Sequence, residues 1–117
     1  MENLNILIVR FLKVLSDPVR LKIIEYLRDN PSSAGKIQDN LNLSQSYTSH
    51  QLKKLKNVDI ITSKRKGRKK KFEIKNKAIY KLISLIKAYI LKAEKEKLEK
   101  IKSLELSTSI QEYKDLF

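Results

Sequence analysis

The chain contains no cysteine, and among its 117 residues there are only two glycines, two prolines and one histidine. The lack of cysteine excludes disulfides, thiolate metal sites and cysteine redox sensing. The single histidine, His50, cannot supply the three or four ligands of a transition-metal site. Two isolated glycines, Gly35 and Gly67, cannot form a glycine-rich phosphate loop. These absences predict a chain with no metal site and no cofactor.

Acidic residues and long apolar runs are also scarce. There are 13 Asp and Glu against 26 Lys and Arg, which gives a net charge of +13 and a pI of about 9.9. The most apolar stretch, LNILIVRFLKVL, is interrupted by Arg10 and Lys13 and is much shorter than the roughly 20 residues of a membrane span. It also lacks a cleavage-site pattern. We therefore expect an intracellular protein with a polyanionic partner, either nucleic acid or an acidic membrane surface.

The excess positive charge is concentrated in the middle of the chain. Residues 44–75 carry a net charge of +9, against +1 for residues 1–43 and +3 for residues 76–117. A chain of 117 residues should form one domain, residues 1–117, and few enzymes of this size enclose an active site. The serines Ser84, Ser103, Ser107 and Ser109 have no neighbouring His or Asp base, so we expect no catalytic residues and no enzyme activity.

Apolar periodicity and capping residues predict four helices before residue 58. Asp17 suits a helix N-cap and Pro18 the first helical position, where a missing N–H costs nothing. Ser32 or Ser33 can cap the third helix and Ser44 the fourth. The expected helices are residues 3–15, 19–28, 34–41 and 45–57.

The fourth expected helix has two distinct faces. Thr48, Leu52 and Leu55 fall on one stripe by the 3.6-residue period. The opposite face carries hydroxyl, amide, imidazole and ammonium groups, which can reach base edges and phosphates in a DNA major groove. Its residues are Ser46, Ser49, His50, Lys53 and Asn57. Together with the preceding short helix, it predicts a helix-turn-helix over residues 33–57.

A basic hairpin is expected directly after this helix. Asp59 stands where the helix must stop, and Asp tolerates a left-handed backbone. Residues 60–66 and 69–75 read as strands around a turn at Gly67, with Ile61, Phe72 and Ile74 facing inward. A helix-turn-helix followed by a basic hairpin, residues 60–75, is a winged helix. We therefore expect a mainly α fold with a minor β component and a two-stranded basic wing.

The last third of the chain predicts a long helix, from residue 76 to about residue 104. Its apolar face is too broad for a solitary helix on so small a domain, so we expect a second subunit to cover part of it. The residues expected at that interface are Ile79, Leu82, Ile83, Ile86, Tyr89 and Ile90. The tail, residues 105–117, is expected to be a short extra helix or loose.

Three segments resemble the ArsR-type winged-helix transcriptional regulators in order and spacing. They are LSDPVRLKIIEYL at 15–27, SQSYTSHQLKKLKNVDII at 44–61 and TSKRKGRKKKFEI at 62–74. The run SHQLKKL is most similar to the zinc-sensing branch. The resemblance implies a homodimer joined through the first and last helices, residues 1–15 and 76–104, with Leu4, Ile8 and Phe11 on the first. It also implies that the two recognition helices bind consecutive major grooves of double-stranded DNA.

The resemblance implies DNA contacts from Gln45, Ser46, Ser49 and His50, with Tyr47 and Lys53 nearby. Tyr47 could equally stack in the groove or pack sideways against the preceding helix. For His50 we favour a base or phosphate contact over a solvated side chain. On the wing the expected contacts are Lys64, Arg65, Lys66, Arg68 and Lys69. Lys53, Lys54 and Lys56 should add salt-dependent attraction to the DNA backbone.

The chain departs from the zinc-sensing branch where that branch has its metal ligands. The corresponding positions are Asn76, Ala78, Tyr89 and Lys92, so we expect no response to metal. The sequence therefore predicts a cytoplasmic, nucleoid-associated repressor that binds specific DNA sequences, with an unidentified small-molecule or protein effector. The alternative is an architectural protein that coats DNA with little sequence preference. RNA binding is a third option, for which the expected aromatic stacking platform is missing.

Overall fold

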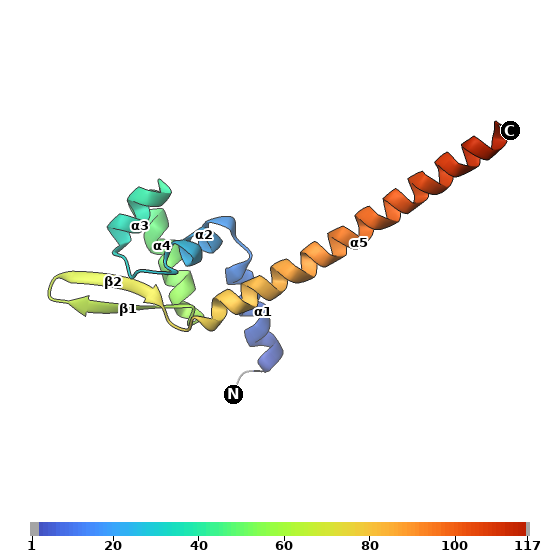
Figure 1. Ribbon diagram of the computed structural model, residues 1–117. Coiled ribbons are helices and arrows are strands. Elements are labelled where there is room, and N and C mark those ends of the chain that lie inside the picture. Colours follow the sequence, from blue (N-terminus) through green and yellow to red (C-terminus); the bar gives the residue numbers. More distant parts are fainter. Residues whose placement is uncertain (1–2, 117) are drawn as a thin grey trace. The chain divides into compact units, whose positions relative to one another are not determined.

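The structure is a computed structural model that describes residues 3–116. The chain divides after Lys77 into two compact units. The first contains four helices and a two-stranded antiparallel sheet, and the second is a single long helix (Figure 1). This is the mainly helical winged helix-turn-helix that the sequence predicts, although the expectation of a single domain stays a prediction. The elements are α1 (Leu4–Leu15), α2 (Pro18–Tyr26), α3 (Ala34–Leu41), α4 (Gln45–Asn57), β1 (Ile61–Lys66), β2 (Lys69–Ile74) and α5 (Ala78–Asp115).

Side-chain caps fix where the helices of the first unit begin. The Asp17 carboxylate accepts a hydrogen bond from the Arg20 backbone N–H at 2.9 Å, and Pro18 occupies the first turn of α2. The Ser33 hydroxyl caps α3 and the Ser44 hydroxyl caps α4, each at 3.2 Å. Each cap satisfies one N–H that the helix itself leaves without a partner. The predicted caps at Asp17 and Ser44 are confirmed, and of the two candidates for α3 it is Ser33 that caps.

Left-handed backbone positions end the elements around α4. Asn42 follows α3 with φ 55°, Asp59 follows α4 with φ 60°, and Gly67 begins the wing turn with φ 61°. Asn and Asp tolerate this region better than other residues with a side chain, and glycine adopts it freely. The Asp59 carboxylate also accepts a hydrogen bond from the Lys75 ammonium at 2.9 Å, which links the start of β1 to the end of β2. The predicted breaks at Asp59 and Gly67 are confirmed.

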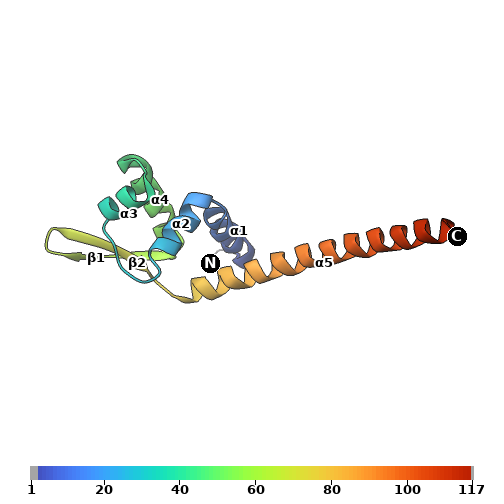
Figure 2. The same cartoon turned by 45° about the horizontal axis from the view of Figure 1, so that its top comes forward.

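The wing is anchored at its base and extends as a free hairpin at its tip (Figures 1 and 2). Ile61 and Phe72 are buried and Ile74 is half-buried, as expected for the inward side. Ser32, which precedes α3, forms an isolated bridge with Phe72: its N–H donates to the Phe72 carbonyl at 3.0 Å, and its carbonyl accepts at 2.8 Å. Both backbone groups of Phe72 therefore bond to Ser32, on the edge of β2 that faces away from β1, which holds the hairpin beside α3.

The first unit has a compact core built from most of its elements. The fully buried side chains at its centre are Ile23 and Ile24 of α2, Ile37 of α3, Leu52 and Leu55 of α4 and Ile61 of β1. Burying an aliphatic side chain of this size stabilises a fold by about 1.5–3 kcal/mol. Because α4 contributes two of these residues and Thr48 as well, its orientation is fixed by the same contacts that stabilise the unit.

α5 is one continuous helix of 38 residues, about 57 Å long at 1.5 Å per residue. The expected end near Leu104 is therefore wrong, and residues 105–115 are neither a separate helix nor loose. The Thr108 hydroxyl donates to the Leu104 carbonyl at 3.0 Å within the helix. Pairs such as Lys97–Glu94 at 3.4 Å support it, and the chain has no glycine or proline after Gly67. Residue 117 lies outside the described residues.

A buried arginine connects three of the helices. The Arg20 side chain donates to the backbone carbonyls of Val14 and Lys13, in the last turn of α1, and to the Gln51 amide oxygen of α4 at 2.7 Å. Arg20 is 8% exposed and Gln51 is 4% exposed. The C-terminal end of a helix carries partial negative charge, which favours a cation there. The Arg20 guanidinium of α2 therefore links α1 to α4. None of these three contacts is to an acidic side chain.

We expect the replacement Gln51→Leu to lower the free energy of unfolding by about 2–4 kcal/mol, because it leaves a buried guanidinium donor without its acceptor. Urea unfolding at a fixed protein concentration measures this. Gln51→Glu is the matched control, since it keeps an acceptor at the same place and adds an opposite charge. A Leu variant as stable as the parent would show that the Arg20–Gln51 hydrogen bond contributes little.

Candidate nucleic-acid interface

One face of α4 is packed in the core and the other is exposed. Thr48, Leu52 and Leu55 are buried as predicted, and Gln51 joins them. The α4 residues that the sequence singled out for DNA contact are Gln45, Ser46, Tyr47, Ser49, His50 and Lys53, and all six are exposed. By the 100° step of a helix, five of them share one arc and Tyr47 lies at its edge. Tyr47 is 39% exposed, so both interpretations of its side chain remain open.

The wing presents two faces, because successive residues of a strand point to opposite sides of the sheet. The register pairs Lys64 with Lys71 and Lys66 with Lys69 on one face. It pairs Arg65 with Lys70 and Ser63 with Phe72 on the other. The five expected wing contacts are therefore not one group: Lys64, Lys66 and Lys69 share a face, Arg65 lies on the opposite one, and Arg68 lies in the turn.

The face that carries Phe72 adjoins α4. Ser49 and Lys53 of α4 line a hollow of about 290 Å³ together with Lys70 and Phe72 of β2. The Lys70 ammonium lies 5.2 Å from the centre of the Phe72 ring, a cation–π distance. Lys56 near the end of α4 donates to the Ser63 hydroxyl of β1 at 2.8 Å. The structure thus brings the polar face of α4 and one row of wing cations to the same place.

Sequence reasoning omitted Lys70 from the expected contacts, although it lies beside the α4 residues that were expected. The period-2 alternation of a strand was the signal that could have found it. Once Phe72 is placed inward, Lys70 must share its side of the sheet.

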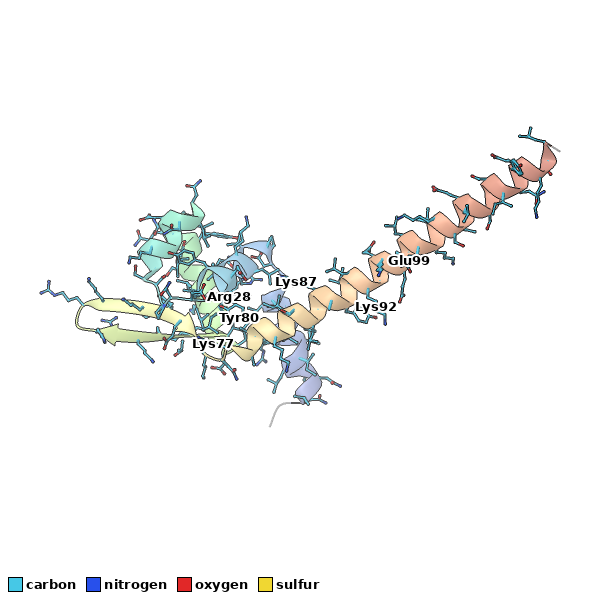
Figure 3. All side chains as sticks on the ribbon, in the orientation of Figure 1. Arg28, Lys77, Tyr80, Lys87, Lys92 and Glu99 are labelled. Carbon is cyan, nitrogen blue, oxygen red and sulfur yellow. The ribbon has the colours of Figure 1, made fainter. Side chains whose placement is uncertain are left out.

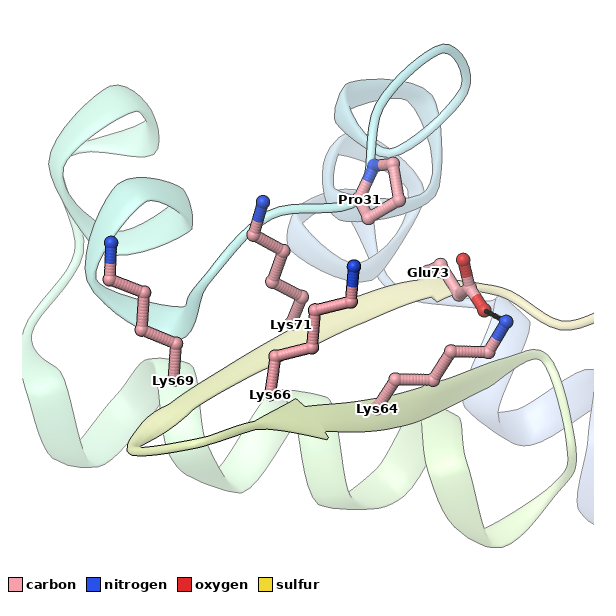
Figure 4. A pocket seen from close by; sticks show the side chains of 6 residues that line it. All are labelled: Pro31, Lys64, Lys66, Lys69, Lys71 and Glu73. Carbon is pink, nitrogen blue, oxygen red and sulfur yellow. Dashed lines mark ion pairs between the residues drawn. The ribbon is translucent and has the colours of Figure 1, made fainter.

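The opposite face carries Lys64, Lys66, Lys69 and Lys71, which line a hollow of about 440 Å³ with Pro31 and Glu73 (Figure 4). Lys64 and Glu73 form an ion pair of 2.8 Å across the strands. The hydrogen bond to Glu73, and then the charge of that carboxylate, raise the pKa of the Lys64 ammonium above its ordinary value of 10.5. Lys64 is therefore an ammonium group at neutral pH.

Within residues 3–116 no group of three or more His, Cys, Asp or Glu residues could hold a metal ion. His50 projects from the exposed face of α4. None of the helices in the part of the chain that the structure describes is both long and apolar enough to cross a membrane.

Comparisons with known proteins agree with this geometry. Residues 17–63 match the family described as "Bacterial regulatory protein, arsR family". The transcriptional repressor SdpR of Bacillus subtilis is 40% identical over 55 residues, which cover 47% of this chain and 61% of SdpR. The chain therefore spans about three fifths of that relative. The HTH-type transcriptional regulator YgaV of Escherichia coli is 35% identical over 77 residues, 65% of this chain and 78% of YgaV.

A solved structure shares the fold. The homodimeric winged helix-turn-helix DNA-binding domain Mb0332 of Mycobacterium bovis superposes with a TM-score of 0.68 at 21% identity, over 74% of this chain and 81% of that domain. The family and the fold are those of DNA-binding transcriptional regulators and not those of enzymes. On the family match, the identity with YgaV and the winged helix-turn-helix itself, the chain belongs to the arsR family of bacterial transcriptional regulators.

Proposed function

We propose that the protein is a homodimer that binds specific double-stranded DNA sequences and represses transcription, without a transition metal as its signal. The observation that carries this proposal is the shared hollow of Ser49 and Lys53 on α4 with Lys70 on the wing. It combines groups that read base edges with groups that bind phosphate on one side of the molecule. An operator-bound dimer would block the access of polymerase to a promoter.

The proposed contacts have two roles, base reading by α4 and attraction to the DNA backbone by the wing. Gln45, Ser46, Tyr47, Ser49, His50 and Lys53 would read bases or adjacent phosphates in the major groove. Lys64, Arg65, Lys66, Arg68 and Lys69 of the wing would supply attraction to the DNA backbone that falls with salt concentration. In a dimer with two-fold symmetry, the half-sites would lie about one helical turn, roughly 10 bp, apart. A protein with these contacts would be cytoplasmic and associated with the nucleoid.

Exposed apolar side chains on α1 and α5 support the proposed dimer. Leu4 of α1 is 70% exposed, and Tyr89 and Ile90 of α5 are 79% and 52% exposed. Large apolar side chains so densely exposed along two helices indicate a partner surface. Of the expected interface residues, Ile8, Leu82 and Ile86 are also exposed, Phe11 and Ile83 are half-buried, and Ile79 is already buried in the single chain. The name of Mb0332 describes a homodimer of this fold.

Repression and metal independence are supported by different observations. The relative SdpR, which is 40% identical to this chain over 55 residues, is named a transcriptional repressor. The resemblance to the zinc-sensing branch aligns its ligand positions with Asn76, Ala78, Tyr89 and Lys92, and none of these is a good ligand for zinc. A small molecule or another protein would then be the effector.

An architectural protein that coats DNA is the second candidate. It is favoured by the net charge of +9 over residues 44–75 and by the two cationic faces of the wing. Selection of binding sites from random DNA separates the candidates. An enriched palindrome supports the regulator, and recovery of unenriched sequences supports the coating protein.

Replacing Ser49 and His50 with Ala should reduce the preference for the selected operator over random DNA, since it removes groups that reach base edges. Replacing Arg65, Lys66 and Arg68 with Gln should weaken binding to both DNAs and flatten the salt dependence. Fluorescence anisotropy titrations at several salt concentrations measure both effects. If the α4 variant discriminates between sequences as the parent does, base reading by this face is wrong.

The protein without DNA should sediment as a dimer at micromolar concentration. The double replacement of Ile86 and Ile90 with Glu should convert it to a monomer, because it would bury two charges in the interface. Replacing Ser84 and Ala88 with Glu is the matched control: it places the same charges at the same spacing on another side of α5 and should leave the dimer intact. A monomeric parent protein would contradict the proposed interface.

Zinc or arsenite should leave operator affinity unchanged within error. The same anisotropy titration, with and without each metal, tests this expectation. A reproducible change of about tenfold, equivalent to roughly 1.4 kcal/mol of coupling, would reveal a metal site on this chain.

A further inference from the structure

Residues of α1, α2 and the last turn of α4 line a hollow of about 290 Å³ in the first unit, which we name the α1–α4 hollow. It shares no lining residue with the hollow beside the wing. Four of the side chains that line it are cationic and none is acidic: the cations are Arg10, Lys13, Arg20 and Lys54. Cations that converge on one small space repel one another, and an anion placed between them would relieve that repulsion.

Arg20 lines the α1–α4 hollow with a buried guanidinium, since the residue is only 8% exposed. A guanidinium has five N–H donors, and the three hydrogen bonds of Arg20 use three of them. The bond to the Lys13 carbonyl is long, at 3.3 Å against the usual range of about 2.7–3.2 Å. Arg20 therefore keeps the capacity to donate to an anion, and hydrogen bonds between charged groups are the strong ones.

Two lysines face this guanidinium from different helices. Lys54 of α4 is half-buried and Lys13 of α1 is exposed. The ion pairs among residues 3–116 involve neither of them. Taking part of a cation out of water without a counter-ion costs free energy, and a bound anion would offset that cost. This distinguishes the α1–α4 hollow from a surface on which every lysine is fully solvated.

The size and position of the hollow indicate a small ligand. Ligand pockets usually measure roughly 300–1,000 Å³, and this hollow stands at the lower end of that range. By the 3.6-residue period, Lys13 lies on the opposite side of α1 from the proposed dimer residues Leu4 and Ile8. A dimer joined through those residues therefore leaves the hollow open. Guanidinium and ammonium groups together suit carboxylate and phosphate oxygens.

We infer that the α1–α4 hollow binds a small dianion, a dicarboxylate or a phosphate, and that this anion is an effector that weakens DNA binding. The inference rests on the proposed function, because an effector acts only if the chain binds an operator. Arg20 and Lys54 would hold the anion from the protein side, and Lys13 would close over it from α1.

The direction of the effect follows from charge. Lys54 belongs to the helix proposed to read DNA, and its ammonium adds to the attraction between that helix and the DNA backbone. An anion bound beside Lys54 neutralises this attraction and places negative charge at the end of α4, so operator affinity falls. Thermodynamic linkage then requires the operator to lower the affinity for the anion by the same factor.

The first test measures anion binding without DNA. Isothermal titration calorimetry at constant ionic strength should show that the full-length parent binds inorganic phosphate or succinate, whereas chloride gives no such signal. Lys13→Glu should abolish this binding, because it places a carboxylate at the hollow. Its side chain is exposed and only its backbone carbonyl serves Arg20, so the fold should stay intact. Lys54→Gln is the second variant and should weaken binding from the α4 side.

Lys92→Glu is the matched control for Lys13→Glu. It makes the same change of charge at an exposed position of α5, which Figure 3 labels, and it should bind the anion as the parent does. An equal loss of binding in both variants would reduce the effect to net charge.

The second test measures coupling to DNA. Saturating phosphate or succinate should lower the operator affinity of the parent by about tenfold, relative to sodium chloride of equal ionic strength. The affinity of Lys13→Glu for the operator should not respond to the anion. In the reverse titration, the operator-bound parent should bind the anion about tenfold more weakly than the free protein.

Several outcomes would overturn the inference. A parent that binds neither phosphate nor succinate has no anion site, and a bound anion that leaves operator affinity unchanged is not an effector. If Lys13→Glu weakens operator binding more than Lys92→Glu does in buffer without either anion, the hollow holds a phosphate of the DNA instead. The proposed function fails separately, if the parent shows no preference for the operator over random DNA of equal length.

Discussion

The arrangement of the surface proposed to bind DNA depends on one buried guanidinium. Arg20 of α2 donates to the carbonyls that end α1 and to Gln51 on the inner face of α4. A buried cation requires hydrogen-bond acceptors, and here they come from a helix terminus and a neutral amide. Because Gln51 is the residue after His50, the inner contact of α4 sets the direction in which its outer residues point. The same side chain fixes α1, which carries part of the proposed dimer surface, against the helix proposed to read DNA.

In the wing, repulsion between cationic side chains opposes the pairing of the two strands. Its tip has Lys or Arg at every cross-strand position from 64 to 66, so repulsion acts along the hairpin. The base offsets this with the buried Ile61 and Phe72, the bridge between Ser32 and Phe72, and the hydrogen bond from Lys56 to Ser63. Gly67 allows the turn without backbone strain. A stable base therefore carries a cationic tip that a bound polyanion would further stabilise.

Local signals in the sequence located most of the elements, because they act between residues close in the chain. The side chains of Asp17 and Ser44 each accept a hydrogen bond from a backbone N–H in the first turn of the helix that follows. Asp59 and Gly67 adopt the left-handed backbone conformation that ends a helix or forms a turn. These roles follow from the residue type and its neighbours in the sequence. The end of α5 was missed for the opposite reason. A serine- and threonine-rich stretch reads as a break, yet Thr108 bonds back within the helix. A hydroxyl side chain can hydrogen-bond to the backbone within a helix or in a turn, so its presence alone does not predict which of these conformations forms.

By itself the sequence determined the winged helix-turn-helix, the exposed face of α4 and the concentration of cations after it, because periodicity and charge are properties of order along the chain. Only the tertiary structure decided which distant groups meet. It paired Arg20 with Gln51, 31 residues apart, and placed Lys70 beside Ser49 and Lys53. It also separated Arg65 from Lys64 and Lys66. Strand register and helix packing decide such contacts, and both depend on how side chains far apart in the chain fit around a common core.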